Sequence, residues 1–328
     1  MFIRKRRPFD PVGGKETPRE LAVGRRKWLA ATGIGAAALA TAGYAGWRRL
    51  RGGDDEVIIP GSGSARLARF FPAPQDGRFQ LDRPQTDEPV AARHTNFYEF
   101  SALKWCWRYV ERFQTDPWTI HVDGLCRQPL KLDIGDFLSR YSADLTERLY
   151  RHRCVETWAM AVPWTGVPLA RVLQDVDPLA TATHVRFISF NRPREAGNIA
   201  SHPSFPWPYV EGLTVAEAKN DLVLLATGMY GHPLLKQHGA PVRLVVPWKY
   251  GYKSIKSIVN IQLLDHEPAT FWTTLNPRAY PFESNVDPEV PRPWPQHTES
   301  MLGSGDRYPT QRYNGYEAYV AGLYSVLR

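Results

Sequence analysis

The stretch "YRHRCVETWAMAVPWTGVPL", Tyr150 to Leu169, says most about the fold of this chain. Within it, Cys154 follows an Arg-His-Arg run, and tryptophan and proline residues interrupt the apolar run that comes next. Cationic neighbours favour the thiolate, which is the form of cysteine that attacks electrophiles and binds metals. From local chemistry alone, Cys154 could be a buried apolar side chain, half of a disulfide, a nucleophile or a metal ligand.

The other cysteines narrow these alternatives. The chain has three cysteines, so at most two of them can pair internally, and the spacing of Cys106 and Cys126 does not require a bridge. We therefore expect buried thiols at both positions. The chain also lacks a Cys-x-x-Cys or Cys/His pattern typical of zinc sites. A single soft thiolate suits a metal that arrives with its other ligands, and this alternative stays open beside a structural cysteine.

Composition and charge limit the classes of protein to which this chain can belong. The 328 residues are 43% hydrophobic, which is enough for a sizeable core in one large domain or two small ones. The net charge is +8, but residues 1–51 carry 12 Lys and Arg against three Asp and Glu, and the rest carries 29 against 30. Because the excess basicity lies at the N-terminus, the charge of the remainder does not support nucleic-acid binding.

The N-terminus resembles an export signal. Arg25 and Arg26 precede an Ala- and Gly-rich apolar stretch, which ends near the small-residue site Ala40-Thr41-Ala42. This pattern predicts a twin-arginine signal peptide over 1–45, and the stretch is weakly apolar for the alternative, a transmembrane anchor. The twin-arginine translocase typically exports folded proteins, often with a cofactor already inserted, so we expect a periplasmic protein with a bulky cofactor.

The rest of the chain predicts one α+β domain. Residues 46–95 are rich in Gly, Pro, Asp and Arg and read as an extended tether that wraps onto a catalytic domain over 96–328. Helical spacing appears over 101–113, and the turn residues Asp123-Gly124 predict a hairpin over 116–133. Further strands are expected over 183–190, 221–231, 240–248 and 256–265, with helices over 134–143, 214–220 and 313–327. Without βαβ alternation or a glycine-rich phosphate loop, a Rossmann site is not expected.

Six stretches together carry a resemblance. They are "NFYEF" (96–100), "DPWTIHVDG" (116–124), the opening stretch (150–169), "PWPYVEGLTVAEA" (206–218), "YGHPLLKQHGAPVRLVVPWKYGYKSIKSI" (230–258) and "YNGYEAYVAGLY" (313–324). In this order they resemble the periplasmic protein-methionine-sulfoxide reductase catalytic subunits, molybdenum enzymes of the sulfite-oxidase fold. The resemblance runs from about residue 90 to the C-terminus and includes the leader. It implies a sulfite-oxidase-type molybdopterin-binding fold with mixed sheets of many short strands.

The resemblance also implies a site. One molybdenum would be held by one molybdopterin, with Cys154 of the Arg-Cys-Val-Glu motif as the catalytic thiolate ligand. The implied cofactor-binding residues are Asn96, Tyr98, Glu99, Ser189, His238, Arg243, Ser254, Ile255 and Lys256. In this scheme Asn96 lies near the open side of the metal, and Arg243 holds the phosphate together with Lys256 and with the backbone amides of residues 254 and 255. His238 stands where the family commonly has Asn, and Ser189 where it has Thr.

The activity implied is oxygen-atom transfer that reduces methionine sulfoxide in periplasmic proteins, with electrons from a membrane haem-binding subunit and a monomeric catalytic subunit. A sulfite dehydrogenase, or another sulfoxide or N-oxide reductase of the same fold, is the alternative; the former needs arginines beside the metal, for which Arg151 and Arg153 are candidates. A non-catalytic periplasmic binding protein is the alternative from another class. The segment 101–113 is aromatic and basic where many relatives have a polar loop. If it borders the substrate opening, substrate preference could differ.

Overall fold

The computed structural model describes residues 65–324. The predicted signal peptide (1–45), the first part of the predicted tether (46–64) and the end of the predicted closing helix (325–328) lie outside these residues. None of the helices in the described part has the length and apolar content that a membrane crossing requires.

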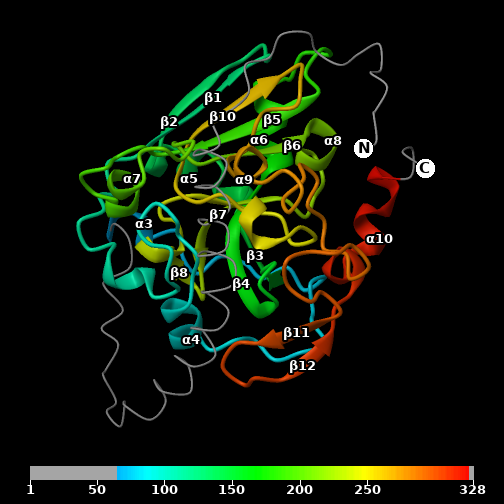
Figure 1. Cartoon of the computed structure of the whole chain (residues 1–328). Helices are drawn as coiled ribbons and strands as arrows, with labels where there is room; N and C mark the ends of the chain where they lie inside the picture. Colours follow the sequence, from blue (N-terminus) through cyan, green and yellow to red (C-terminus); the bar gives the residue numbers. More distant parts are fainter. Residues whose placement is uncertain (1–64, 325–328) are drawn as a thin grey trace, which may run out of the picture. The chain divides into compact units, whose positions relative to one another are not determined.

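The strands of the described residues form two mixed sheets (Figure 1). The first has the order β2-β1-β10-β5-β6, with β1 Thr119–Gly124, β2 Leu130–Asp133, β5 His184–Ser189, β6 Val210–Thr214 and β10 Ile258–Leu264. In it β1 and β10 are parallel, and the other neighbours are antiparallel. The second has the order β12-β11-β4-β7-β8, and β3 and β9 pair with β4 and β7. Its strands are β3 Thr146–Arg153, β4 Trp158–Pro168, β7 Leu224–Met229, β8 His232–Pro233, β9 Arg243–Val245, β11 Thr298–Met301 and β12 Arg307–Pro309.

Short helices connect these strands. The α-helices are α3 Ala65–Ala68, α4 Glu88–Arg93, α5 Ile134–Arg140, α6 Leu169–Val176, α7 Gly197–Ser201, α8 Val215–Ala218, α9 Phe271–Leu275 and α10 Glu317–Val320. The 3-10 turns are η1 Cys106–Arg108, η2 Ser142–Asp144, η3 Lys236–His238, η4 Gly251–Lys253, η5 Arg312–Gly315 and η6 Ala321–Leu323. Their caps follow from the sequence: in α8, for example, Thr214 and Glu217 form a reciprocal capping box.

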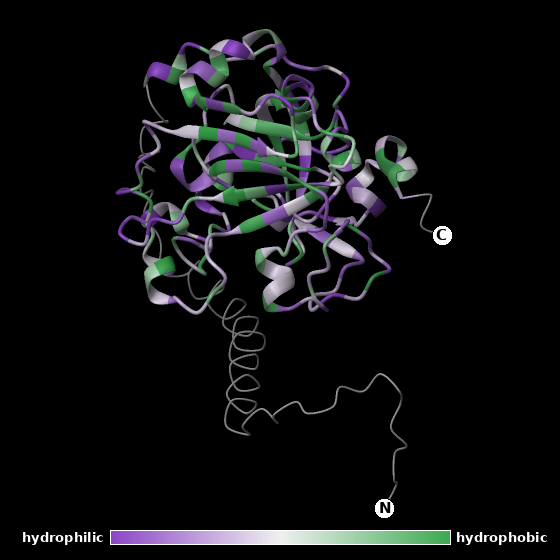
Figure 2. Cartoon of the chain, turned by 90° about the horizontal axis from the view of Figure 1, so that it is seen from above, coloured by the Kyte–Doolittle hydropathy of each residue, from purple (hydrophilic) through white to green (hydrophobic). Residues whose placement is uncertain are grey.

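The core lies on the strands. β4 is buried without interruption from Ala159 to Val167, because β3 and β7 cover both of its edges and other segments pack on both faces. α6 buries Leu169, Val172, Leu173 and Val176, the i, i+3, i+4, i+7 positions of an amphipathic helix. Figure 2 shows hydrophobic colour concentrated on the central strands and hydrophilic colour on the surrounding loops.

Most predicted elements are confirmed. The hairpin over 116–133 forms as β1 and β2, with its loop just after Gly124. The predicted helices over 134–143 and 214–220 form as α5 and α8, and the four further predicted strands form as β5, β7, β9 and β10. The predicted closing helix is broken into η5, α10 and η6, because Tyr313 and Asn314 take left-handed backbone angles (φ 50° and 54°).

The predicted helix over 101–113 is wrong. Only the 3-10 turn η1 forms there. Thr95 N donates to Lys104 O (2.9 Å), and the Cys106 thiol donates to Leu103 O (2.9 Å). These contacts bind the backbone to a neighbouring segment and leave no regular helical ladder. Tryptophan, tyrosine and phenylalanine, which are frequent here, are only moderate helix formers, so long-range contacts decide the conformation.

The described part of the predicted tether runs beside the second sheet. Asp76 N donates to Glu147 O (2.8 Å) on β3, and Thr86 N donates to Ala161 O (2.9 Å) on β4. Short helical turns, α3 and α4, interrupt it. Asn96 follows α4 directly along the chain, so this segment leads from the sheet to the region around Cys154.

Candidate active site

Cys154 lies in the tight turn that joins β3 to β4. Cys154 N donates to Trp158 O (3.0 Å), and Thr157 N donates to Cys154 O (3.0 Å). Thr157 has φ +76°, a left-handed conformation that is unusual for a β-branched residue. The hairpin thus holds the sulfur at its end, where only 6% of the residue is exposed.

Polar side chains surround the sulfur. Asn96 Nδ2 lies 3.5 Å from Cys154 Sγ, and so does the Glu156 backbone nitrogen. Lys104 forms an ion pair with the Glu156 carboxylate and donates to Asn96 Oδ1 (2.5 Å). Trp158 Nε1 also donates to Glu156 Oε2 (3.1 Å). The thiol therefore faces a fixed amide and an ionised carboxylate, in addition to the aromatic side chains that pack around the turn.

The charge of Arg153 does lower the pKa of the Cys154 thiol, as the Arg-His-Arg run predicts, but burial and the charge of Glu156 outweigh it. Burial, followed by repulsion from Glu156, raises the pKa of the Cys154 thiol to about 12. Arg151 donates to Asp82 Oδ1 (2.8 Å) and to Asn314 O (3.1 Å), away from the sulfur. A thiolate here needs a positive charge brought to the sulfur itself, which a metal ion supplies.

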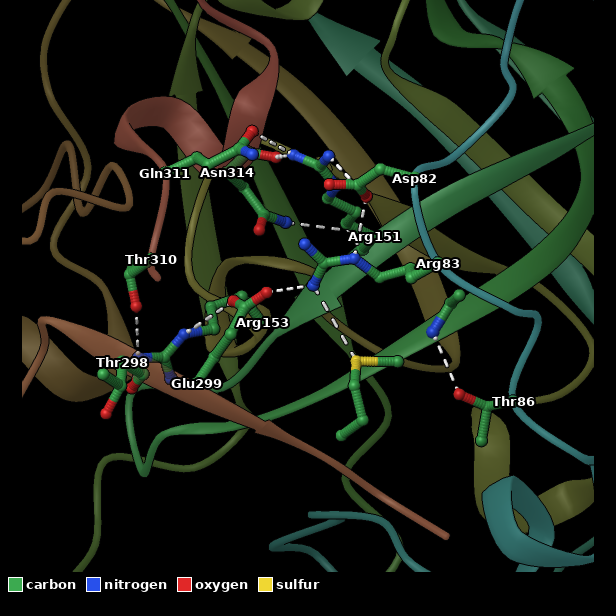
Figure 3. Close-up of polar contacts among 12 residues, drawn as sticks. Asp82, Arg83, Thr86, Arg151, Arg153, Thr298, Glu299, Thr310, Gln311 and Asn314 are labelled. Carbon is green, nitrogen blue, oxygen red and sulfur yellow. Dashed lines mark hydrogen bonds and ion pairs between the residues drawn. The ribbon is translucent and has the colours of Figure 1, made fainter. Parts of the chain in front are cut away.

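Figure 3 shows where the second arginine of this run points. Arg153 Nε lies 3.3 Å from Glu299 Oε2, and Arg83 pairs with the other oxygen of the same carboxylate. All three side chains are buried. Since Arg151 and Arg153 are both engaged in this way, they do not form the arginine pocket that a sulfite dehydrogenase needs beside its metal.

A second group of side chains is cationic and lacks such a carboxylate. Arg243 on β9 is 2% exposed, and its donors go to backbone oxygens: Nη1 to His238 O (3.0 Å) and Nη2 to Ser254 O (2.9 Å). Its guanidinium also packs over the ring of Trp164 (4.7 Å to the centroid). Burial lowers the pKa of Arg243 to about 9, and among residues 65–324 no carboxylate pairs with it.

His238 and Lys256 complete what we call the cationic cluster: Arg243, His238 and Lys256. His238 is buried, its Nε2 has no hydrogen-bond partner in the described chain, and burial with the charge of Arg243 lowers its pKa to about 3. Lys256 donates to Asn96 O (2.7 Å), and burial with repulsion from Arg243 lowers its pKa to about 7. Burial, together with the charge of Arg243, also lowers the pKa of His152 well below its ordinary value.

Glu99 and Ser189 lie beside this cluster. Ser189 Oγ is 3.0 Å from Glu99 Oε1 and 2.9 Å from Lys256 O. Burial raises the pKa of Glu99 to about 7, although the Lys256 charge opposes this shift. Glu99 and Lys256 thus influence each other, whereas buried Arg243 has no carboxylate beside it among residues 65–324, which favours an added anion.

The structure places the remaining predicted residues as follows. The Ser254 amide already donates to Gly251 O (3.1 Å), and its hydroxyl accepts from Val246 N (3.1 Å), so both have partners inside the chain. The Ile255 side chain is buried in the core. The Tyr98 ring packs edge-on against Trp272 (4.9 Å), and the nearby Glu156 and Cys154 charges, added to burial, raise the pKa of Tyr98.

Comparison with known proteins gives the family. The family described as "Oxidoreductase molybdopterin binding domain" matches residues 108–272. The protein-methionine-sulfoxide reductase catalytic subunit MsrP of Gluconobacter oxydans (strain 621H) is 42% identical over 322 residues, which cover 96% of this chain and 95% of that protein. The MsrP of Ralstonia nicotianae (strain ATCC BAA-1114 / GMI1000) is 38% identical over 328 residues, covering 96% and 94%. The chain belongs to the MsrP family.

Membership in the MsrP family makes the chain an oxidoreductase with a molybdopterin-binding domain of the sulfite-oxidase type, which confirms the predicted family and α+β fold class. Among solved structures, the sulfane dehydrogenase SoxCD from Paracoccus pantotrophus aligns at 16% identity, with a TM-score of 0.41, over 61% of this chain and 46% of that one.

The residues present fit the cofactor of the MsrP family. A molybdopterin has an anionic phosphate at one end and a soft metal centre at the other. The cationic cluster offers an unpartnered nitrogen, His238 Nε2, and two cations, buried Arg243 and half-buried Lys256, without an ion-pairing carboxylate in residues 65–324. The cluster is joined to the thiol through one residue, because Asn96 O accepts from Lys256 while Asn96 Nδ2 faces Cys154 Sγ.

Sequence reasoning missed three residues of this MsrP-family site. Glu156 stands two positions after Cys154, inside the quoted motif, so its place near the sulfur could have been inferred. His152 could have been inferred too, because it precedes Cys154 by two residues, near the end of β3. Lys104 lies 50 residues away in a segment predicted to be helical, and no local signal marks its contact with Glu156 and Asn96.

Proposed function

We propose that this protein reduces methionine sulfoxide side chains of periplasmic proteins to methionine, by oxygen-atom transfer at one molybdenum held by one molybdopterin. The observation that carries the proposal is the cationic cluster, with its unpartnered His238 Nε2, joined through Asn96 to the single thiol of Cys154. The names of two full-length relatives supply the substrate class.

In this proposal, one set of side chains holds the cofactor and another set orients the substrate. Arg243 and Lys256 would hold the phosphate, because charge-assisted hydrogen bonds to an oxyanion relieve their mutual repulsion, and neutral His238 would donate a hydrogen bond to it from Nε2. Cys154 would give its thiolate to the metal. When bound, the cofactor supplies a two-electron reducing centre that accepts the oxygen of the sulfoxide.

Asn96 faces the sulfur of Cys154, and Lys104 holds Asn96 in this position. Lys104 donates to Asn96 Oδ1, so the amide nitrogen is turned toward Cys154 and Glu156. A fixed amide donor of this kind can hydrogen-bond the polar S–O group of a substrate and orient it before reaction. The ion pair with Lys104 and the hydrogen bonds from Trp158 and Asn96 outweigh burial and lower the pKa of Glu156, so this carboxylate stays ionised.

The wider setting is part of the proposal. The paired arginines and apolar stretch of residues 25–45 support export of the folded protein to the periplasm by the twin-arginine translocase. The relatives are named catalytic subunits, which supports a partner subunit, and we propose a membrane haem-binding protein that donates electrons to a monomeric catalytic chain. The near balance of charge outside residues 1–51 means that this docking need not depend on a strong overall field.

The test compares two cysteine substitutions in the exported holoenzyme. Cys154→Ser is expected to lower both bound molybdenum, measured by elemental analysis, and reductant-dependent loss of methionine sulfoxide by at least about 100-fold. Cys126→Ser, at a half-buried free thiol, is the matched control and is expected to retain both. Molybdenum-dependent activity that survives in Cys154→Ser would contradict the ligand assignment. Sulfite-dependent dye reduction without sulfoxide reduction would replace the proposed activity by the alternative.

A further inference from the structure

An exposed apolar surface lies in one short segment beside the site. We call residues 101–113 the rim segment. Among residues 65–324, five large apolar side chains are exposed, and three of them belong to it: Leu103 (47%), Trp105 (43%) and Tyr109 (48%). Single exposed apolar residues are ordinary, but a group of them on one segment marks an interaction site.

The rim segment is held in place from beneath. Cys106, Val110 and Phe113 are buried, and the ring of Phe113 packs against Phe190 (4.6 Å between centroids). The Cys106 thiol and the Lys104 carbonyl bond to backbone groups, as described above. The backbone is thereby fixed while Leu103, Trp105 and Tyr109 stay outside. Rigid, outward aromatic side chains lose little entropy when they bind, which is why they dominate binding surfaces.

The same segment reaches the thiol. Lys104 lies between Leu103 and Trp105, and its ammonium group contacts Asn96 and Glu156, the two residues nearest to Cys154 Sγ. Because consecutive Cα atoms are about 3.8 Å apart, Leu103 and Trp105 lie next to the backbone from which the Lys104 side chain reaches the site. A substrate whose reactive group reaches Cys154 on this side passes over the rim segment.

The charge of the rim segment is complementary to acidic chains. Arg108 and Arg112 are exposed, and no carboxylate of the described residues pairs with either guanidinium. Lys236 donates to Glu111 O (2.8 Å), which brings another cation to the surface. Glu111 is the single carboxylate of the segment. An apolar surface bordered by unpaired guanidiniums suits a polypeptide that carries both apolar and acidic side chains.

We propose that the rim segment binds the stretch of polypeptide that flanks the oxidised methionine, and that it prefers stretches with apolar and acidic residues. A flexible stretch can lay successive side chains on Trp105 and Tyr109 while its sulfoxide side chain enters beside Lys104. This inference deepens the proposed function and rests on it for the reaction, but the binding step can be measured without turnover.

The first experiment measures binding to the holoenzyme by fluorescence anisotropy. The probes are two labelled peptides with one methionine sulfoxide each, one flanked by Leu and Asp and the other by Gly and Lys. The double variant Trp105→Ala/Tyr109→Ala is expected to bind the Leu/Asp peptide at least about tenfold more weakly than the unsubstituted enzyme, with unchanged molybdenum content. Tyr319→Ala is the matched control, because Tyr319 is 49% exposed on α10, which Figure 1 shows well away from the α4 side where η1 lies. Its affinity is expected to stay within about twofold.

Equal affinity of the double variant and the unsubstituted enzyme for the Leu/Asp peptide, or equal binding of both peptides by the unsubstituted enzyme, would overturn the proposal.

The second experiment compares turnover of the Leu/Asp peptide with turnover of free methionine sulfoxide, using a dye as reductant. In the double variant, the ratio of the peptide kcat/KM to the free amino-acid kcat/KM is expected to fall about tenfold. An equal fall for both substrates overturns the rim proposal but leaves the proposed function standing. If the unsubstituted enzyme reduces neither substrate, the proposed function fails, and the anisotropy measurement still decides the rim proposal. If the variant binds peptide normally but accepts electrons slowly from its membrane partner, the surface belongs to that partner and the proposal is overturned.

Discussion

Two buried groups of cationic side chains differ in one respect. Arg83 and Arg153 share the carboxylate of Glu299, and all three are buried together. Arg243 is buried and Lys256 half-buried, but no carboxylate in the described part of the chain forms an ion pair with either of them, and Glu99 acts on Lys256 only from a distance. Burying an unpaired charge is costly, whereas a paired and hydrogen-bonded charge can be tolerated. The first group is therefore complete within the chain, and the second is completed by an anion from outside.

Removing the shared carboxylate should give the largest effect. Glu299→Gln keeps the shape of the side chain but leaves the buried guanidinium of Arg153 without a counter-charge and Arg83 with Asp82 alone, so we expect a loss of about 3–5 kcal/mol in the free energy of unfolding. Urea unfolding of the cofactor-free protein measures it. The control Glu317→Gln removes an exposed carboxylate that lies 3.8 Å from Arg312, and it is expected to cost less than about 0.5 kcal/mol. Similar losses for the two variants would remove the distinction between a closed ion cluster and a surface pair.

Replacing the unpaired arginine should act on the cofactor instead. Arg243→Met is expected to weaken retention of molybdopterin by about 10–100-fold, which corresponds to the loss of about 1.5–3 kcal/mol of charge-assisted hydrogen bonding. The free energy of unfolding of the cofactor-free protein should fall less than in Glu299→Gln, because the abandoned partners are neutral backbone oxygens and no buried charge is left unpaired. Pterin fluorescence after extraction and urea unfolding measure the two quantities. A variant that keeps its full pterin content would place the phosphate elsewhere.

The pH dependence of stability gives a third test of the difference between the paired group, Arg83 and Arg153, and the unpaired group, Arg243 and Lys256. Because the pKa of Lys256 falls from 10.5 to about 7 on folding, the folded cofactor-free protein binds fewer protons there than the unfolded chain does. Lys256 therefore adds stability above pH 10.5 that is lost as the pH falls toward 7. We expect the Tm of the cofactor-free protein to drop between pH 9 and pH 7, and to drop less in Lys256→Met. The pKa of Glu99 is raised from 4.5 to about 7, so its own stability change has the opposite sign and falls in a lower window.

The smallest effect is expected at His238. Asn can donate one hydrogen bond as neutral His does, so His238→Asn should keep molybdopterin content within about twofold. His238→Leu removes the donor that Nε2 supplies and should lower it by about tenfold. If His238→Leu loads the cofactor as well as His238→Asn does, His238 Nε2 is not part of the phosphate site.

Local patterns in the sequence were enough to predict a large part of the fold. The β1–β2 hairpin follows from alternation and the turn at Gly124, and β9 and β10 follow from their Val, Ile and Leu content. Six motifs in order were enough to identify the family and to single out Cys154. These features depend on neighbouring residues or on matching short stretches, and a linear sequence contains both kinds of information.

The rest depends on contacts between distant parts of the chain. The rim segment was predicted to be a helix, yet Lys104 turns inward to Glu156 and Asn96 while Trp105 and Tyr109 stay exposed. Arg151 and Arg153 precede Cys154 in sequence, but they pair with Asp82 and Glu299, and burial outweighs the effect of the Arg153 charge on the sulfur. Charge pairing depends on distances in space, and a linear pattern contains no record of which carboxylate folding brings within reach of which cation.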